Sequence, residues 1–172
     1  MEIDNLISTL EQHIKNPEDG LPDDIFYFIG RNTPYVNIDL VVRDSEANIL
    51  LIWRDDQHYG PGWHLPGGII RFREQMTKRV EKVANGECGI IPKDITGPLE
   101  FFESIDTKQK ERSHFITFIF SCRVDVSKTE LKFGKDWLIR LEKTGRFFQF
   151  FPKEMIPLHW KYKKFFKKAP ND

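Results

Sequence analysis

Residues 67–88 begin with two adjacent glycines and continue with a long helical pattern. This combination restricts the folds that the chain can adopt. At about 100° per residue, Met76, Val80 and Val83 fall on one side of a helix predicted over residues 74–88. Glu87 falls on the same side, where a carboxylate is costly to bury unless it is paired or binds a cation. The alternative is that Glu87 lies close enough to the helix end to reach water.

Both ends of this helix have residues suited to their positions. Gly67 and Gly68 precede it and allow the backbone to approach a ligand closely. Gly89 supplies the left-handed residue that ends a helix, and Ile90 adds the hydrophobic contact that accompanies such an end. Gly86 is a weak point near this terminus, which costs up to ~1 kcal/mol relative to alanine.

Elsewhere the hydrophobic pattern alternates between helix and strand. Apolar and polar residues alternate over residues 36–42, which predicts a half-buried strand. Further strands are predicted at residues 49–54, 99–105, 114–124 and 146–151, and further helices at residues 2–15, 22–30 and 157–168. This order predicts one α/β domain over residues 1–172, in which residues 1–30 form an N-terminal helical extension.

The composition excludes several classes of protein. Lys and Arg number 26, as do Asp and Glu, so a net charge of zero gives no reason to expect nucleic acid or an anionic membrane as a partner. The two cysteines, Cys88 and Cys122, belong to no CxxC pair or His/Cys cluster. The N-terminus lacks the pattern of a signal peptide, and the apolar stretches are too short to span a membrane. A cytoplasmic protein is therefore expected.

The segment GIIRFREQMTKRVEKVANGECGI, residues 68–90, resembles the Nudix box, GX5EX7REUXEEXGU, where U is a bulky aliphatic residue. The matching residues are Gly68, Glu74, Glu87, Gly89 and Ile90, with Ala84 a weak match at the first U. Trp63 and the Pro-Gly-Gly before the box also match the usual lead-in. Lys82 stands at the arginine of the pattern, while Val83 and Gly86 replace two of the family's three metal-binding glutamates.

The resemblance implies a Nudix-type α/β/α sandwich and a hydrolase that uses Mg²⁺. A cluster of glutamates on one helical face would hold several Mg²⁺ ions and activate water for attack on phosphorus, whereas one glutamate holds roughly one ion. Glu87 is therefore expected to be the principal side-chain metal ligand, aided by the carbonyl of Gly67. One Mg²⁺ still neutralises a departing diphosphate, which favours attack of water at the sugar carbon.

Residues 21–125 are similar in particular to the GDP-mannose mannosyl hydrolase branch, which keeps only the last glutamate of the box. In this comparison Asp39 matches a substrate-binding aspartate, Arg54 a diphosphate-contacting arginine, and His114 a histidine that starts a strand. His114 is equally compatible with a structural role as a hydrogen-bonded histidine at the strand edge.

The sequence departs from this branch at two sites. The branch has an arginine after Pro-Gly-Gly that assists departure of the diphosphate, where this chain has Ile69, although Arg71 and Arg73 are near. The branch also has a Gln-His pair that binds Mg²⁺ and acts as general base, and this chain has Thr144 and Gly145 there. A substitute base is therefore expected, and Glu103 and His114 are the candidates by position.

These comparisons give two sets of predicted site residues besides the metal ligands. The catalytic candidates are Glu74, Lys82, Glu103 and His114. The candidates for substrate binding are Asp39, Arg54, His58, Trp63 and Arg71. His159 is surrounded by no motif. The lysines between Lys161 and Lys168 are interpreted as the solvated face of a helix, and the alternative is that they cover an anionic substrate across a dimer.

The leading functional hypothesis is a Mg²⁺-dependent hydrolase of a nucleoside diphosphate sugar, with GDP-mannose the first to test. The alternatives are a Nudix-fold protein that binds a nucleotide sugar without turnover, and a conventional Nudix pyrophosphohydrolase. A homodimer is also expected, because the resembling branch is dimeric and the apolar side of the first helix needs a surface to cover. Burial of that helix against its own domain is the competing explanation.

Overall fold

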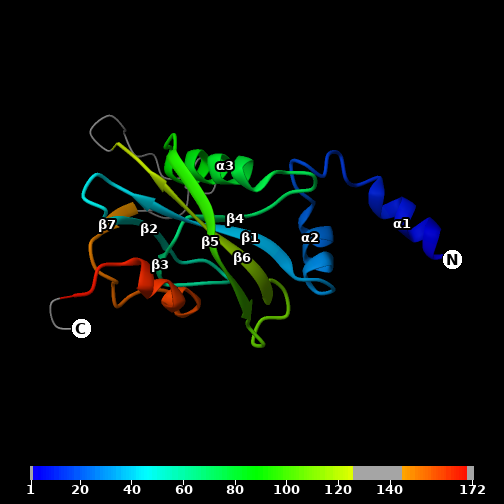
Figure 1. Cartoon of the computed structure of the whole chain (residues 1–172). Coiled ribbons are helices and arrows are strands. Elements are labelled where there is room, and N and C mark those ends of the chain that lie inside the picture. The colour runs from blue at the N-terminus through cyan, green and yellow to red at the C-terminus, as the bar shows by residue number, and fades with distance from the viewer. Residues whose placement is uncertain (1, 126–144, 170–172) are drawn as a thin grey trace.

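The computed structural model describes residues 2–125 and 145–169. Within them, a mixed sheet has α3 (Met76–Cys88) on one face and the C-terminal segment on the other (Figure 1). The predicted α/β sandwich is confirmed. The other helices are α1 (Ile3–Glu11), α2 (Asp23–Gly30) and a 3₁₀ helix, η1 (Pro157–Phe165).

The sheet is built around β1 (Tyr35–Arg43), which pairs in parallel with β6 (His114–Arg123). The other pairings between strands are antiparallel and give the order β3-β2-β1-β6-β5, with β4 added to β1 and β7 added to β2. The remaining strands are β2 (Ile49–Arg54), β3 (Gly62–His64), β4 (Gly67–Ile69), β5 (Lys93–Ile105) and β7 (Gly145–Phe148).

The prediction that β1 is half-buried is wrong, because residues 38–42 are buried without interruption. Ile38, Leu40 and Val42 face the core under α3, while Val41 packs into a second core with Tyr162 of η1. A strand covered on both faces loses the polar positions that a solvated face would have. Asp39 is the exception, and it is only 5% exposed.

The buried face and the C-terminal end of α3 agree with the prediction from the sequence. Val80, Val83, Ala84 and Cys88 form its buried face. Gly89 has a φ of 67°, and the Ile90 N–H donates to the Ala84 carbonyl at 3.1 Å, which is the predicted glycine-terminated end. The C-terminal segment differs from the prediction, because residues 157–165 form a 3₁₀ helix rather than an α-helix.

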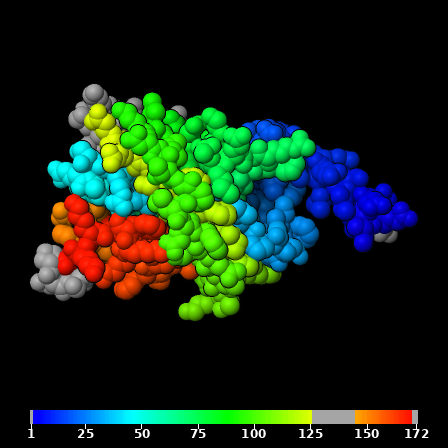
Figure 2. All heavy atoms as spheres, in the orientation of Figure 1, coloured from blue at the N-terminus to red at the C-terminus, as the bar shows by residue number. Residues whose placement is uncertain are grey.

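The helix α1 extends away from the rest of the molecule (Figures 1 and 2). Each of its residues is exposed, including the apolar residues Ile3, Leu6, Ile7 and Leu10. The competing explanation, that this apolar side is buried against its own domain, is therefore wrong. In the described part of the chain, no helix is both long enough and apolar enough to cross a membrane.

Candidate active site

A cavity of about 280 Å³ opens on the sheet face opposite α3. Its walls come from α2, the C-terminal end of α3, the strands β1 to β6, η1 and the loops between them. Six charged side chains line it: Asp39, Arg54, Arg71, Glu87, Arg112 and Lys161. With four cationic side chains against two carboxylates, the cavity suits an anionic ligand.

The box helix presents one carboxylate to this cavity, that of Glu87. Val83 is 4% exposed and packs so closely on Gly68 that a Cβ there would lie 2.9 Å from Val83 Cγ2. A Cβ at Gly86 would meet no atom within 4 Å, so this position faces open space. Neither of the two positions that lack the family's glutamates offers an oxygen to the cavity.

The pairing of β4 with β1 explains why Gly67 must be a glycine. Gly67 lies directly opposite Asp39, and a Cβ added to it would lie 2.2 Å from Asp39 Oδ1. The Leu40 N–H donates to the Pro66 carbonyl and the Ile70 N–H to the Val36 carbonyl, so the hydrogen-bonded pairs alternate with the Asp39–Gly67 pair. The carbonyl of Gly67 is therefore not used in the β1–β4 ladder.

Asp39 is held in the cavity wall by hydrogen bonds from two side chains. The Tyr162 hydroxyl donates to Asp39 Oδ2, and Asn37 Nδ2 donates to Oδ1 at 3.0 Å. Burial raises the pKa of the Asp39 carboxyl to about 6 from its ordinary 3.8, although the hydrogen bond from Tyr162 and the charge of Lys161 oppose the rise. A carboxyl group with such a pKa is suited to accept a proton near neutral pH.

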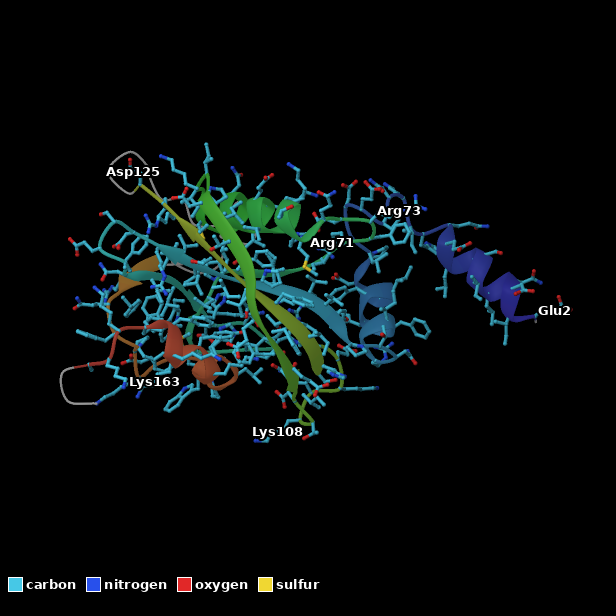
Figure 3. The ribbon with its side chains drawn as sticks, viewed as in Figure 1. Glu2, Arg71, Arg73, Lys108, Asp125 and Lys163 are labelled. Carbon is cyan, nitrogen blue, oxygen red and sulfur yellow. The ribbon has the colours of Figure 1, made fainter. Side chains whose placement is uncertain are left out.

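The cations reach the cavity from distant parts of the chain. Arg54 lies over the ring of Tyr59, with Cζ 4.8 Å from the ring centroid. Figure 3 shows Arg71 between α3 and α2, with Arg73 farther from the sheet. Lys161 donates to the hydroxyl of Ser104 on β5, and burial lowers the pKa of its ammonium group while the charge of Asp39 opposes this. The prediction that the lysines of this segment form only a solvated face is wrong at Lys161.

His159 also lines the cavity, although the sequence around it gave no functional signal. Its Nδ1 accepts a hydrogen bond from the Leu65 N–H at 3.3 Å. Burial holds the pKa of the ring well below its ordinary value, so the ring is neutral at pH 7. A neutral imidazole whose Nδ1 is an acceptor has its hydrogen on Nε2, and it therefore offers a donor rather than a base.

Two predicted catalytic residues, Glu74 and Lys82, form an ion-paired cluster and do not line the cavity. Glu74 contacts Lys82 Nζ at 2.9 Å and Arg79 Nη2 at 2.6 Å, and it accepts a hydrogen bond from the Arg71 N–H at 3.0 Å. Burial opposes ionisation of Glu74, but these donors outweigh it and lower the pKa of its carboxyl group. This arrangement joins the loop before α3 to the helix.

The other predicted catalytic residues, Glu103 and His114, also lie outside the cavity lining. They contact each other, with Oε1 and Nε2 3.1 Å apart. On their strands the neighbouring residues Ser104 and Phe115 line the cavity instead, and side chains alternate between the two faces of a strand. The structure therefore does not bring either candidate base to the cavity side of the sheet.

Of the predicted substrate-binding residues, Asp39, Arg54 and Arg71 line the cavity and two others do not. Trp63 is a core residue that packs edge-on against Trp53 and Phe148. His58 lies in the loop after β2, where its Nε2 is 3.3 Å from the Tyr27 hydroxyl.

The residues of the cavity fit a single Mg²⁺ ion rather than a metal cluster. Across residues 2–125 and 145–169, no group of three or more His, Cys, Asp or Glu side chains is arranged to hold a metal ion. Mg²⁺ is commonly bound by one or two carboxylates together with water and substrate phosphates. Glu87 and the Gly67 carbonyl supply such a partial set. Thr144, which aligns with the glutamine of the GDP-mannose mannosyl hydrolase branch, lies outside the described residues.

The chain is similar in sequence to known proteins over much of its length. The sequence model of the NUDIX domain matches residues 33–168. The chain is 30% identical to the low-salt glycan biosynthesis protein Agl8 of Haloferax volcanii over 121 residues, which cover 67% of this chain and 75% of that protein. It is 32% identical to an ADP-ribose pyrophosphatase of Methanocaldococcus jannaschii over 103 residues, which cover 60% of this chain and 57% of that protein.

The fold is also shared with solved structures. A MutT NUDIX hydrolase of Burkholderia pseudomallei superposes with a TM-score of 0.57 at 22% sequence identity, over 68% of this chain and 84% of that chain. The matched domain spans most of the sequence, and its box helix lies where the sequence pattern placed it. The chain therefore belongs to the Nudix hydrolase family.

Proposed function

We propose that this Nudix hydrolase cleaves a nucleoside diphosphate sugar in a Mg²⁺-dependent reaction, with GDP-mannose the first substrate to test. The observation that carries the proposal is the combination of one box carboxylate, Glu87, with the cationic side chains of Arg54, Arg71 and Lys161 in one cavity. Arginine and lysine side chains bind the oxygens of a diphosphate, and Mg²⁺ would add further positive charge to the same group.

The single carboxylate argues for attack at carbon rather than at phosphorus. Attack on phosphorus is best served by metal ions that stabilise both the entering and the leaving oxygens. Attack on the anomeric carbon requires only that the departing diphosphate be neutralised, and Arg54 and Lys161 are placed to contribute to this. The oxygen of water then bonds to the anomeric carbon as the bond from that carbon to the diphosphate oxygen breaks.

Asp39 is the proposed general base, in place of Glu103 and His114. It lines the cavity, its pKa is raised to about 6, and it is therefore ionised above that pH. The proton of the attacking water passes to this carboxylate, so that the products are a free sugar of inverted configuration and a nucleoside diphosphate. His159 offers its Nε2 hydrogen to a substrate oxygen on the same side.

The names of two relatives support a nucleotide-linked sugar as the substrate class. One relative is named for glycan biosynthesis and the other for hydrolysis of ADP-ribose. The second name favours a competing function, pyrophosphohydrolysis, in which water attacks phosphorus. The two reactions differ in the bond that breaks and are distinguished by the position of the entering oxygen.

The test is hydrolysis in oxygen-18 water with GDP-mannose, UDP-glucose and ADP-ribose, each with and without Mg²⁺. Label in the released sugar supports the proposal, and label in a phosphate overturns it in favour of pyrophosphohydrolysis. A Glu87→Gln preparation, purified in parallel, measures contaminating activity. If no substrate is turned over but one raises the melting temperature, the chain is a nucleotide-sugar binding protein and the proposed hydrolysis is wrong.

A further inference from the structure

The end of the cavity farthest from Asp39 is lined by three aromatic side chains and an arginine. Phe26 of α2, Phe115 of β6, Tyr59 and Arg112 line this end. Along β1, the cavity runs from the level of Tyr35, which is paired with Phe115, to Asp39. Four residues of a strand span about 13 Å, so the two ends contact different parts of an extended ligand.

Arg112 lies at this end of the cavity, and one of its hydrogen-bond donors has no acceptor among the described residues. Its Cζ lies 5.7 Å from the ring centroid of Phe26 and 5.8 Å from that of Phe115. Its Nε is buried and has no hydrogen-bond partner within the described part of the chain. A buried donor without a partner is costly, and the cost is removed when a ligand supplies an acceptor.

The surroundings hold Arg112 and the rings in place. Its backbone has a φ of 42°, an uncommon value for a residue other than glycine, and its carbonyl accepts a hydrogen bond from the Tyr59 hydroxyl at 2.8 Å. Strained backbone of this kind tends to occur at ligand sites. Behind the cavity wall, Tyr35 stacks on Phe26 with 4.7 Å between ring centroids, and its hydroxyl donates to the Phe26 carbonyl at 2.7 Å.

We infer that Phe26, Phe115 and Arg112 form the subsite for the nucleobase. This inference rests on the proposed function, because it assigns the base of the same nucleotide ligand. Phenyl rings are flat surfaces on which a base stacks, and Tyr35 already covers one face of Phe26. Arginine has only donors, so it matches a base edge that presents two acceptors, and guanine does so with O6 and N7. Adenine presents an amino group beside N7, which opposes the arginine.

The binding experiment uses GDP, IDP, ADP and inorganic pyrophosphate at one fixed Mg²⁺ concentration, with affinities measured by calorimetry. IDP is included because its base has O6 and N7 but not the 2-amino group of guanine. Wild-type protein should bind GDP and IDP about tenfold to a hundredfold more tightly than ADP, as expected for a bidentate arginine contact. Pyrophosphate reports the diphosphate contacts alone.

Two substitutions separate the parts of the subsite. Arg112→Lys keeps the charge but loses the planar fork, so it should bring the affinity for GDP and IDP down to that for ADP without changing the affinity for pyrophosphate. Phe115→Leu should weaken the binding of all three nucleotides and again leave pyrophosphate unchanged. Lys108→Ala, at the tip of the same β5–β6 loop (Figure 3), is the control and should change none of the affinities.

The inference is overturned by equal losses for pyrophosphate and GDP in Arg112→Lys, which would make Arg112 a diphosphate ligand. It is also overturned by an unchanged GDP-to-ADP ratio in that variant, or by absence of nucleotide binding to the wild-type protein. Because the terminal phosphate of GDP and IDP carries no sugar, the proposed hydrolysis cannot act on them, and the result does not depend on that turnover. Failure of the proposed hydrolysis is therefore distinguishable from failure of this subsite.

Discussion

Tyr162, near the C-terminal end of the described chain, donates its hydroxyl hydrogen to the buried carboxylate of Asp39 in the middle of β1. Both residues line the cavity, together with His159 and Lys161 from the same 3₁₀ helix. The C-terminal segment thus does more than cover the sheet. It sets the environment of the carboxylate that is proposed to accept the proton from water.

Asp39→Asn is expected to make the folded protein more stable at neutral pH. The carboxyl pKa is about 6 in the folded state against 3.8 for the unfolded chain, so ionisation of Asp39 opposes folding. Removing it should raise the free energy of unfolding by about 1–3 kcal/mol at pH 7. The gain should be absent below pH 3.8, appear as the pH rises to 6, and stay constant above it; urea unfolding at several pH values measures this. A variant less stable than wild type at pH 7 would contradict it.

The pH dependence of hydrolysis should reflect the ionisation of the Asp39 carboxyl group. Since the base must be ionised, kcat/KM should rise with pH through a value near 6 and then level off. In Asp39→Asn, the rising limb of the pH profile should disappear, and the rate should fall about 10²–10⁴-fold. Initial rates measured between pH 4.5 and 8 give the profile. A rising limb that persists in Asp39→Asn would assign the base to another residue.

Glu87→Gln is expected to remove stabilisation by Mg²⁺ while leaving the fold intact. The substitution keeps the volume of the side chain and removes the charge that attracts the cation. The measurement is the shift in melting temperature on adding Mg²⁺ or EDTA. Glu81→Gln on the same helix is the control, because Glu81 pairs with Lys78 and does not line the cavity that contains Glu87. A wild-type response in Glu87→Gln would place the metal site elsewhere.

Glu74→Gln is expected to destabilise the protein by about 1–3 kcal/mol at pH 7, because Arg79, whose side chain is only 13% exposed, loses its charged partner. Since the folded pKa of Glu74 is lowered, its contribution is present above the ordinary value of 4.5 and is lost as the pH falls through the folded value. The difference from wild type should therefore shrink at acid pH. Lys78→Met, which removes an exposed ion pair, is the matched control and should cost about 0.5 kcal/mol or less. Equal losses in the two variants would contradict a structural role for Glu74.

The exposed side of α1 is expected to be covered by a second copy of the chain. Ile3 is 73% exposed and Leu6 is 47% exposed, on a helix that extends from the molecule (Figure 2). Light scattering at micromolar concentration should give twice the chain mass of 20.4 kDa for the wild type and the chain mass for Leu6→Asp. A wild-type monomer would contradict the homodimer.

The features that follow from local spacing could be predicted from the sequence. The period of residues 74–88 fixed which side of α3 is buried, and Gly89 and Ile90 marked its end. The box pattern located Glu87, and the resemblance to the GDP-mannose mannosyl hydrolase branch singled out Asp39 and Arg54; the side chains of these residues line the cavity. Each of these predictions depends on residues close together in the chain.

The tertiary structure decided which face of the sheet carries the cavity and which distant segments complete it. Alternation along β6 separates His114 from Phe115, but only the packing of α3 and the C-terminal segment on opposite faces shows that Phe115 is on the cavity side. Arg112, His159 and Lys161 carry no local signal, because their roles come from contacts with residues far away in sequence. Likewise, the pKa of Asp39 depends on burial and on Tyr162, and both arise only when the chain packs around β1.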